Sequence, residues 1–393
     1  MEQRTGRSVT VDGRLRVALV AGTLGAGGAE KQLVYLAGAL KTMGAEVTVC
    51  SLTRGEHYEP VLREAGLEPI WVGRFASPAA RTLAIARALA PMQPHIVQAT
   101  HFYTNLYASL VAPVYGALGV GTARSDIVHE VRANGMWGRW LLRIPGALIV
   151  NSHAARRNAI ASGVDEAAVT VLPNVIDLRE FDSLARCESV ADSLLPADGA
   201  NGMVVAAAGS LLPVKRFDRF IRAIALARAR GARVSGVIAG DGPLRAELEA
   251  LPATLGLPPD AVIFTGRLTN LPALLERVHA FVLSSEHEGF PNVLIEAMAA
   301  RLPTIATPAG DASSIVQDGA TGFLVPMDDE DAMAARLLEL EASPPLRARL
   351  GAAGRSCVER CYASDALPER LAGIYRSIAL RRGNRRVLSL LGD

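Results

Sequence analysis

The sequence predicts an α/β protein built from two doubly wound domains, and three observations lead to this prediction. Short apolar runs, many of them β-branched, alternate with longer helical patterns along the chain. The alternation stops once, between residues 178 and 202, and then begins again. The chain has 393 residues, half of them apolar and 36 of them glycine, which is too long for one ordinary core and suits two cores with many tight turns.

The first domain is predicted over residues 14–180. It opens with a strand at 16–21, a glycine-rich turn and a helix at about 29–43, the order expected in a parallel sheet covered by helices. Residues 106–123 fit a buried helix followed by a buried strand. Further strands are predicted at 47–51, 95–99, 148–151 and 169–172.

The second domain is predicted over residues 203–372, after a polar linker at 181–202 that contains several glycines and prolines. The basic segment 373–393 is expected to form a helix that packs back on the first domain. Strands are predicted at 203–208, 234–239, 261–265, 280–283 and 303–306. Because doubly wound sheets bind ligands at the carboxyl ends of their strands, we expect the two domains to face each other across a ligand-binding cleft.

Composition argues against two classes of function. Lys and Arg number 41 against 39 Asp and Glu, and this near balance gives no support to a nucleic-acid binder. The cysteines lack the paired spacing of a metal site, so we expect no bound metal and buried thiols in a reducing compartment. They are Cys50, Cys187, Cys357 and Cys361.

No segment has the pattern of a membrane span, because the longest uncharged run, residues 106–123, is broken by Pro113 and by glycines. We therefore expect a soluble, cytoplasmic protein. Two stretches leave peripheral contact with a membrane open as an alternative to an ordinary solvated or packed surface. One is the tail with Arg381, Arg382, Arg385 and Arg386, and the other is RANGMWGRWLLRIPG, which interleaves Trp137 and Trp140 with Arg139 and Arg143.

The stretch EHEGFPNVLIEAM places one carboxylate, Glu288, in a turn and another, Glu296, inside the apolar helix that follows. Pro291 suits the first turn of that helix. A helix N-terminus between two carboxylates suits a ligand with a diphosphate in the middle and sugar hydroxyls at both ends. A solvated acidic turn is the alternative, and the apolar neighbours of Glu296 argue against it.

Several cations are expected at the carboxyl ends of strands. Lys215 and Arg216 in GSLLPVKRFD can stabilise the charge of a departing diphosphate, and Arg267 in FTGR follows another strand. His101 in QATHFYTN follows a strand of the first domain. Each of these residues also fits a purely structural role when it is considered alone.

The turn GTLGAGGAEK is not a dinucleotide-binding fingerprint. That fingerprint needs a third glycine where Glu30 stands, and an acidic residue at the end of the second strand, which VTVCSLTR lacks. An NAD-dependent oxidoreductase is therefore an unlikely reading of the first domain.

The motifs, taken in order, resemble those of the retaining glycosyltransferases of family 4, which have the GT-B fold of two Rossmann-like domains facing across a cleft. The resemblance runs from GGAEK at Gly27 to the segment ending in GATGFLVP at Pro326. Its most specific part is the E-x7-E motif formed by Glu288 and Glu296. The other matching motifs are GSLLPVKRFD, AGDGPLR, FTGR, NSHAA and LPNVID.

The resemblance implies metal-independent transfer of a sugar from a nucleotide-diphosphate donor, with no cofactor besides this co-substrate. By the resemblance, Lys215 faces the leaving diphosphate, Glu288 contacts the donor sugar, and His101 lines the sugar and acceptor side. Glu296 binds the ribose, and phosphates and sugar are held by the turn Gly27–Gly28 and by the backbone of Gly289, Phe290, Asn292 and Val293. The family commonly has Arg where this chain has Ser210, which leaves Arg216 as the candidate for a second positive charge.

The resemblance leaves the substrates open. UDP-sugars are favoured as donors over GDP-sugars on family frequency, and the acceptor is a glycan, a lipid-linked sugar or a small molecule, as in cell-surface polysaccharide or glycoconjugate biosynthesis. A nucleotide-sugar epimerase on the same fold and a non-catalytic sugar-nucleotide binding protein are the alternatives, the latter because of Ser210.

Overall fold

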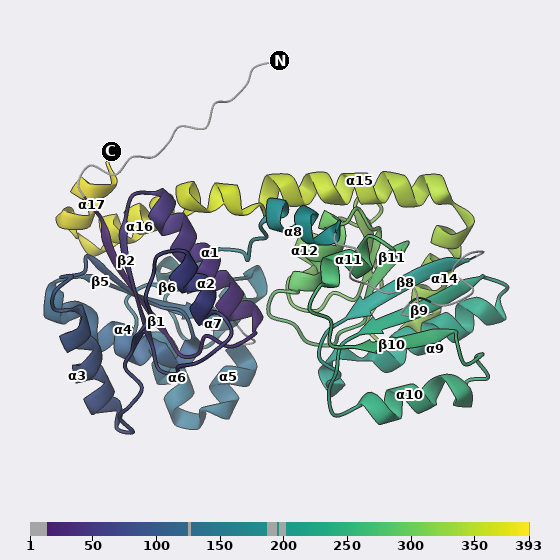
Figure 1. The fold of residues 1–393 in the computed structure, drawn as a ribbon, viewed down its shortest axis with the longest axis horizontal. Coiled ribbons are helices and arrows are strands. Elements are labelled where there is room, and N and C mark those ends of the chain that lie inside the picture. Colours follow the sequence, from purple (N-terminus) through teal and green to yellow (C-terminus); the bar gives the residue numbers. More distant parts are fainter. Residues whose placement is uncertain (1–13, 125–126, 187–194, 196–201, 393) are drawn as a thin grey trace, which may run out of the picture. The chain divides into compact units, whose positions relative to one another are not determined.

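A computed structural model describes residues 14–124, 127–186, 195 and 202–392. The chain divides into two compact units (Figure 1). Unit 1 contains the chain up to Val175 and again from Ser364, and unit 2 contains Ile176–Ala363. Each unit is built around its own parallel sheet, as the alternation of strand and helix patterns predicted.

Unit 1 has a seven-stranded sheet in the order β3-β2-β1-β4-β5-β6-β7. Its strands are β1 (Arg16–Ala21), β2 (Glu46–Ser51), β3 (Ile70–Trp71), β4 (Ile96–Ala99), β5 (Leu118–Ala123), β6 (Leu148–Val150) and β7 (Val169–Val171). Its α-helices are α1 (Gly28–Thr42), α2 (Glu59–Glu64), α3 (Pro78–Leu89), α4 (Asn105–Val111), α5 (Ile127–Ala133), α6 (Gly135–Arg143), α7 (His153–Ala161), α16 (Leu367–Arg382) and α17 (Arg385–Leu391). Four short 3-10 helices complete it: η1 (Phe102–Thr104), η2 (Ala112–Tyr115), η3 (Glu166–Ala168) and η7 (Ser364–Ala366).

The central strand β1 is buried on both faces, because its successive side chains point to opposite sides of the sheet. Val17 and Leu19 pack with residues of α1 and α16, whereas Ala18 and Val20 pack with residues of α3 and α4. This burial explains why the strand reads as a continuous apolar run. The helix that follows, α1, carries Glu30 in its first turn and Lys41 in its last, which complements its dipole.

The carboxyl-terminal helices of the chain are part of the core of unit 1. Leu371 and Tyr375 of α16 and Val387 of α17 are buried in the same apolar cluster as Leu19 and other residues of β1 and α1. The Tyr375 hydroxyl donates a hydrogen bond to Oε1 of Gln98 in β4 at 2.6 Å. Unit 1 is therefore completed by a segment that follows unit 2 in the sequence.

Unit 2 has a six-stranded sheet in the order β10-β9-β8-β11-β12-β13. Its strands are β8 (Met203–Ala208), β9 (Val234–Ala239), β10 (Val262–Gly266), β11 (Ala280–Leu283), β12 (Thr304–Ala306) and β13 (Gly322–Leu324). Its helices are α8 (Leu178–Ala185), the 3-10 helix η6 (Pro213–Lys215), α9 (Phe217–Ala229), α10 (Arg245–Thr254), α11 (Leu271–Leu275), α12 (Asn292–Ala299), α13 (Ala312–Ile315), α14 (Glu330–Ala342) and α15 (Pro344–Cys361). Residues of α9 and α14 pack on one face of β8, and residues of α11 and α12 pack on the other.

The unit boundaries differ from the boundaries predicted at residues 180, 203 and 372, because apolar side chains near them are buried in a different core from the one predicted. The first domain was predicted to end at residue 180 and a linker to begin at 181, but these residues belong to α8, whose Phe181 is buried in the core of unit 2. Leu367 and Leu371 were assigned to the second domain, but both are buried in the core of unit 1. Residues 187–194 and 196–201 of the predicted linker lie outside the described residues.

The two sheets have the same strand order, except that β7 of unit 1 has no counterpart in unit 2. In each, the first strand of the unit lies beside its fourth, β1 beside β4 in unit 1 and β8 beside β11 in unit 2. The chain leaves the first strand toward one edge of the sheet and returns to build the other edge from the fourth. This reversal point is where doubly wound sheets bind ligands, at the carboxyl ends of the two strands.

Candidate functional site

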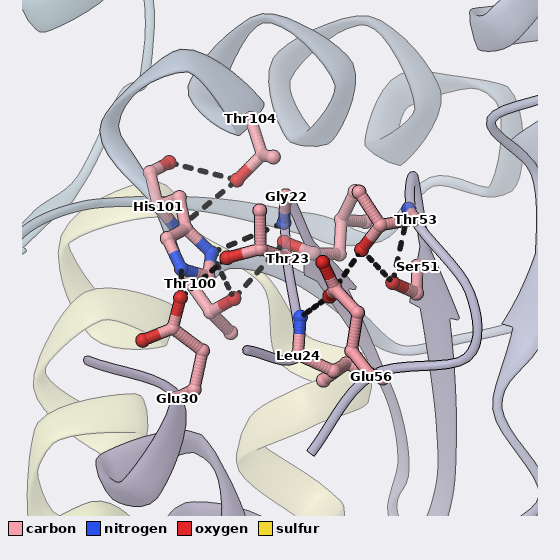
Figure 2. Close-up of polar contacts among 11 residues, drawn as sticks. Gly22, Thr23, Leu24, Glu30, Ser51, Thr53, Glu56, Thr100, His101 and Thr104 are labelled. Atoms are coloured by element: carbon pink, nitrogen blue, oxygen red, sulfur yellow. Dashed lines mark hydrogen bonds and ion pairs between the residues drawn. The ribbon is translucent and has the colours of Figure 1, made fainter. Parts of the chain in front are cut away.

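In unit 1, the glycine turn between β1 and α1 is held by side chains from other segments (Figure 2). The Gly22 N–H donates to Nδ1 of His101 at 3.1 Å. The Leu24 N–H donates to the Glu56 carboxylate, which also accepts a hydrogen bond from Thr53 Oγ1 at 2.5 Å. The turn is therefore fixed although half of its residues are glycine.

His101 lies just beyond β4, at the reversal point of the sheet. Its backbone is held by Thr104, whose Oγ1 donates to the His101 carbonyl at 2.7 Å and accepts from the His101 N–H at 3.2 Å. Because Nδ1 accepts the Gly22 N–H, the network assigns the ring proton to Nε2. Nε2 lies 3.3 Å from Oε1 of Glu30, so the imidazole donates to this carboxylate.

Glu30 is the functional candidate that the sequence analysis missed. Its side chain is only 12% exposed, and its carboxylate accepts hydrogen bonds from His101 and from the Thr23 hydroxyl. Burial alone would raise the pKa of Glu30, but these hydrogen bonds outweigh it and lower the pKa. The carboxylate therefore stays ionised beside the histidine.

Gly27 and Gly28, predicted to hold phosphates and sugar, lie at the start of α1. Gly27 caps the helix in an extended conformation and Gly28 is its first residue. A Cβ atom on Gly27 would overlap Oε2 of Glu30, which is the flexible end of a side chain. The missing side chain at position 27 thus leaves room for the Glu30 carboxylate.

In unit 2, Lys215 and Glu288 form a direct ion pair. The Lys215 Nζ lies 2.6 Å from Oε1 of Glu288, which also accepts a hydrogen bond from Ser285 Oγ at 2.7 Å. The Glu288 side chain is 9% exposed and that of Lys215 is 24% exposed. The sequence predicted both residues at strand ends, and the structure adds that they contact each other.

The pair is held in place because the loop between β11 and α12 is bonded to η6. The Glu286 N–H donates to the Val214 carbonyl at 2.8 Å, and Ser284 Oγ donates to the Lys215 carbonyl at 3.0 Å. Gly310 lies against the same loop with a φ of 58°. A Cβ atom there would overlap the Glu288 carbonyl, so this close approach requires glycine.

Arg216 is committed to neighbouring carboxylates. It is a non-glycine residue in the left-handed region, with a φ of 49°. Its guanidinium makes two hydrogen bonds of 3.0 Å with Asp218, and Glu286 and Asp328 each lie 3.6 Å from Nη1. The hydrogen bonds with Asp218 raise the pKa of Arg216 despite its partial burial. Its charge is thus largely balanced within unit 2, which weakens its candidacy as the second cation.

Ser210 and Arg267 are both exposed, each one residue beyond a glycine at the end of a strand. Ser210 follows Gly209 after β8, and Arg267 follows Gly266, the last residue of β10. A Cβ atom on Gly240 would overlap the Gly209 carbonyl, so the loops after β8 and β9 pack backbone against backbone. Ser210 and Arg267 thus project from a tightly packed edge of the sheet.

Helix α12 begins at Asn292 with Pro291 as its N-cap residue. The motif carboxylates therefore lie on either side of the helix start, Glu288 in the preceding loop and Glu296 in the helix, as predicted. Gly289 and Val293 are half-buried, as are Asn292 and Glu296.

The side chain of Phe290 does not belong to the site. It is 7% exposed and its ring contacts that of Tyr362, with centroids 5.8 Å apart. Only the backbone of Phe290 remains a candidate for ligand binding, which is the role that the resemblance gave it. The ring is part of the apolar core of unit 2.

Within the described residues, no group of three or more His, Cys, Asp or Glu side chains is arranged to hold a metal ion. Cys50 and Cys357 are buried and Cys361 is exposed, and Cys187 lies outside the part of the chain that the structure describes. Among the helices in that part, none is both long enough and apolar enough to cross a bilayer.

Family models match both halves of the chain. The Glycosyltransferase Family 4 model matches residues 26–180, and the model for glycosyl transferases group 1 matches residues 199–356. The chain has the GT-B fold, and its two units are the two Rossmann-like domains of that fold. HepE of Anabaena, crystallised with UDP and glucose, has a similar structure with a TM-score of 0.77 at 19% identity, covering 93% of this chain and 100% of HepE.

Curated relatives carry the same identification. The GDP-mannose-dependent alpha-mannosyltransferase of Mycobacterium tuberculosis is 31% identical over 318 residues, 77% of this chain and 78% of that protein. The alpha-D-kanosaminyltransferase of Streptomyces kanamyceticus is 33% identical over 179 residues, 45% of this chain and 46% of that protein. The match thus spans about half the length of the kanosaminyltransferase. The chain belongs to the glycosyltransferases of family 4.

Proposed function

We propose that this protein is a retaining glycosyltransferase that moves a sugar from a nucleotide-diphosphate donor to an acceptor hydroxyl. One observation carries the proposal: the Lys215–Glu288 ion pair lies in the loops at the reversal point of the unit 2 sheet, directly before the N-terminus of α12. A lysine, a helix N-terminus and a carboxylate at one place suit a ligand that joins a diphosphate to a polyhydroxylated sugar.

The donor occupies unit 2 in this proposal. Its diphosphate lies at the N-terminus of α12, beside the backbone of Gly289, Phe290, Asn292 and Val293, and Lys215 faces it. Glu288 accepts hydrogen bonds from hydroxyls of the donor sugar, and Glu296 from those of the ribose. Arg267 and Ser210 border the donor at the edge of the sheet. In unit 1, Gly28 and His101 keep the roles that the resemblance gives them. Lys215 supplies positive charge, so no metal ion and no further cofactor are required.

The chemistry follows from these charges. The bond between the anomeric carbon and the diphosphate oxygen breaks, and Lys215 stabilises the negative charge that gathers on the leaving group. The acceptor hydroxyl attacks the same face of the sugar and forms the new glycosidic bond. The acceptor proton passes to the departing diphosphate oxygen. Because the acceptor attacks the face that the diphosphate leaves, the anomeric configuration is retained without a protein nucleophile.

Two donor classes are supported by relatives. HepE was crystallised with UDP and with UDP-glucose, and the mycobacterial relative is named for GDP-mannose. We propose a UDP-sugar first and a GDP-sugar second. A screen of both donor classes, with released UDP or GDP as the readout and acceptor trials with the best donor, tests the assignment.

The same screen separates the alternatives. An epimerase converts the donor sugar when no acceptor is present, and a non-catalytic binding protein binds a donor but releases no nucleotide with any acceptor or by slow hydrolysis. Release of UDP or GDP that depends on an acceptor, together with a new glycoside of retained configuration, supports the transferase. Conversion of donor alone, or binding without release, contradicts it.

For the acceptor, we propose a glycan or lipid-linked sugar at the cytoplasmic face of a membrane, in polysaccharide or glycoconjugate biosynthesis. Helix α6 supports this proposal because Met136, Trp137 and Trp140 are 91%, 68% and 43% exposed, whereas its Leu141 and Leu142 are buried. Arg139 and Arg143 are exposed on the same helix, which contains no acidic residue. Exposed aromatic and basic side chains on one amphipathic helix suit an anionic lipid surface.

A liposome assay tests this contact. Changing Trp137 and Trp140 together to serine should weaken sedimentation with vesicles that contain anionic lipid, with little change in transfer to a water-soluble acceptor. As a control, Val114, which is 65% exposed in η2, is changed to serine and should leave vesicle binding unchanged. Unchanged binding of the double tryptophan variant would overturn the membrane assignment.

A further inference from the structure

We propose that Glu30 is a positioning residue for His101, and that position 27 is glycine because the Glu30 carboxylate lies there. The inference deepens the proposed function, because it rests on His101 lining the sugar in unit 1. It concerns residues within unit 1 alone (Figure 2). It also gives Gly27 a role different from the direct contact with the donor that the family resemblance implies.

Four contacts determine how the imidazole of His101 lies. Thr104 holds the backbone. At the ring, the Gly22 N–H donates to Nδ1, the Thr100 hydroxyl lies 3.2 Å from the same nitrogen, and Glu30 accepts from Nε2 at 3.3 Å. Of these, only the contact with Glu30 comes from a side chain that reaches the distal nitrogen. Without it, Nε2–H loses its acceptor, and the ring is held only at Nδ1. The Thr100 hydroxyl can accept from a protonated Nδ1, so the second tautomer then competes with the first, since neutral imidazole carries its proton on either nitrogen.

Glu30 is itself held in one place. The Thr23 hydroxyl donates to the same oxygen, Oε1, that accepts from His101. Glu30 lies in the first turn of α1, where the helix dipole favours a negative charge. A carboxylate that only stabilised the helix could point into solvent. The Glu30 side chain is instead 12% exposed and accepts a hydrogen bond from His101.

Gly27 allows this arrangement. A Cβ atom at position 27 would overlap Oε2 of Glu30, while the contacting atom belongs to a movable side chain and not to backbone. Alanine at position 27 should therefore displace the carboxylate and leave the turn intact. Gly25 provides a matched control in the same turn, because a Cβ atom there meets nothing within 4 Å.

The kinetic experiment is a mutant cycle with the donor and acceptor identified by the screen. Glu30→Ala and Gly27→Ala should each lower kcat about ten- to a hundredfold, the range seen when the partner that orients a histidine is removed. Donor KM should change less than kcat. The double variant should be no worse than either single variant, Glu30→Gln should retain most activity because its amide oxygen still accepts from Nε2, and Gly25→Ala should match the wild type.

Two kinetic outcomes would overturn the inference. If the losses of Gly27→Ala and Glu30→Ala multiply in the double variant, Gly27 acts through its own contact with substrate. If Glu30→Ala leaves kcat unchanged, Glu30 has no positioning role. Full loss in Glu30→Gln would also count against orientation as its function, because that variant keeps the hydrogen-bond acceptor.

A second measurement decides the inference even if no donor supports transfer. In imidazole ¹⁵N spectra, the His101 signals are identified by their loss in His101→Ala. The wild type and Gly25→Ala should show a single tautomer protonated at Nε2, and Glu30→Ala and Gly27→Ala should show a mixture. A merely structural Glu30 would lower the melting temperature and leave the tautomer unchanged, and that result would refute the proposal independently of the transferase assignment.

Discussion

Each unit pairs a nitrogen-bearing side chain with a carboxylate at the reversal point of its sheet, but the strands that the two groups follow are exchanged between the units. In unit 2 the nitrogen, Lys215, follows the first strand and the carboxylate, Glu288, follows the fourth. In unit 1 the carboxylate, Glu30, follows the first strand and the nitrogen, His101, follows the fourth. The distances are 2.6 Å and 3.3 Å.

The two pairs differ in the side chain that carries the nitrogen, a lysine in unit 2 and a histidine in unit 1. In unit 2 the ammonium of Lys215 is a cationic donor paired with the Glu288 carboxylate, and such a donor suits a diphosphate. In unit 1 the imidazole of His101 accepts at Nδ1 and donates from Nε2 to the Glu30 carboxylate, which gives a hydrogen-bonding surface that suits sugar hydroxyls. The comparison teaches that one sheet geometry supports either task, depending on whether the nitrogen belongs to a lysine or to a histidine.

The largest expected effect comes from removing the permanent cation. Lys215→Ala should lower kcat about a hundred- to a thousandfold, the cost of deleting a group that stabilises charge in the transition state. His101→Ala should cost less than Lys215→Ala but at least as much as Glu30→Ala, about a hundredfold, because Glu30 acts through His101. Both are measured by nucleotide release.

Arg216→Ala is the matched control for Lys215→Ala, because Arg216 is the next residue and already bonds Asp218. It should affect kcat far less. Circular dichroism and melting temperature show whether each variant is folded. A fully folded Lys215→Ala variant with near-normal kcat would remove the proposed difference between the two units.

The next prediction tests the close packing of Gly310 against the loop that carries Glu288. Gly310→Ala should destabilise unit 2 by about 1–3 kcal/mol from its left-handed backbone alone, with a further loss because its Cβ overlaps the Glu288 carbonyl. Gly319→Ala isolates the backbone effect, because Gly319 also has a positive φ but its Cβ would meet nothing within 4 Å. Denaturant unfolding and kcat are measured for both.

Equal losses of stability in these two variants, with normal kcat in Gly310→Ala, would show that the contact with the Glu288 loop has no functional weight. In contrast, a loss of kcat confined to Gly310→Ala would support it. The imidazole spectrum of His101 should be unchanged in both variants, because neither touches unit 1.

A feature common to both units predicts acid sensitivity. His95 precedes β4 and accepts the Arg16 N–H at Nδ1, and His279 precedes β11 and accepts the Val204 N–H in the same way. Burial, reinforced by the charges of Arg16 and Arg386, lowers the pKa of His95 from 6.5 to about 4. Burial also lowers the pKa of His279, with a contribution from Arg347.

The unfolded chain therefore takes up these protons at a higher pH than the folded chain does. For His95, the stabilisation is complete above about pH 6.5 and is lost as the pH falls toward 4. His95→Asn keeps an acceptor oxygen and removes the titration, so its melting temperature should fall less steeply over this range than that of the wild type. His279→Asn is the counterpart in unit 2. The prediction is contradicted if the melting temperatures of the wild type and both variants fall equally steeply as the pH is lowered.

The smallest expected effect concerns Ser210. Ser210→Arg adds a cation at an exposed position at the end of β8, where the family commonly has arginine. An exposed pairing contributes at most about 1 kcal/mol, so donor KM should fall no more than about fivefold. Nucleotide-release kinetics across a salt series measure it, and an unchanged KM at low salt would show that the second cation is dispensable here.

The strands were largely predictable from the sequence, and their side-chain partners were not. The bounds of β1, β8, β9 and β11 coincide with the predicted ones, because each is buried on both faces and almost wholly apolar, with Arg16 of β1 and Ser235 of β9 as the exceptions. The sequence analysis did not single out β3, which has only two residues and shows no period, or β13, whose short run begins with a glycine directly after the turn QDGAT.

For the candidate site, the sequence indicated which residues stand at strand ends but not which of them pair. Lys215 and Glu288 are 73 residues apart, and Glu30 and His101 are 71 apart. Glu30 was noticed only as the wrong residue for a dinucleotide fingerprint, although it is part of the GGAEK motif. Arg216 and Asp218 are only two residues apart, yet their hydrogen bonds depend on a left-handed backbone at Arg216 that no sequence pattern indicates.

The return of α16 and α17 to the core of unit 1 has a consequence for synthesis on the ribosome. The strands of unit 1 emerge first, yet the apolar surface that receives Leu371 and Tyr375 stays uncovered until the whole of unit 2 has been translated. At ordinary elongation rates that interval is roughly 10–40 s. The nascent chain thus exposes an apolar surface to chaperones for that time, and unit 2 is the first unit whose whole sequence is translated.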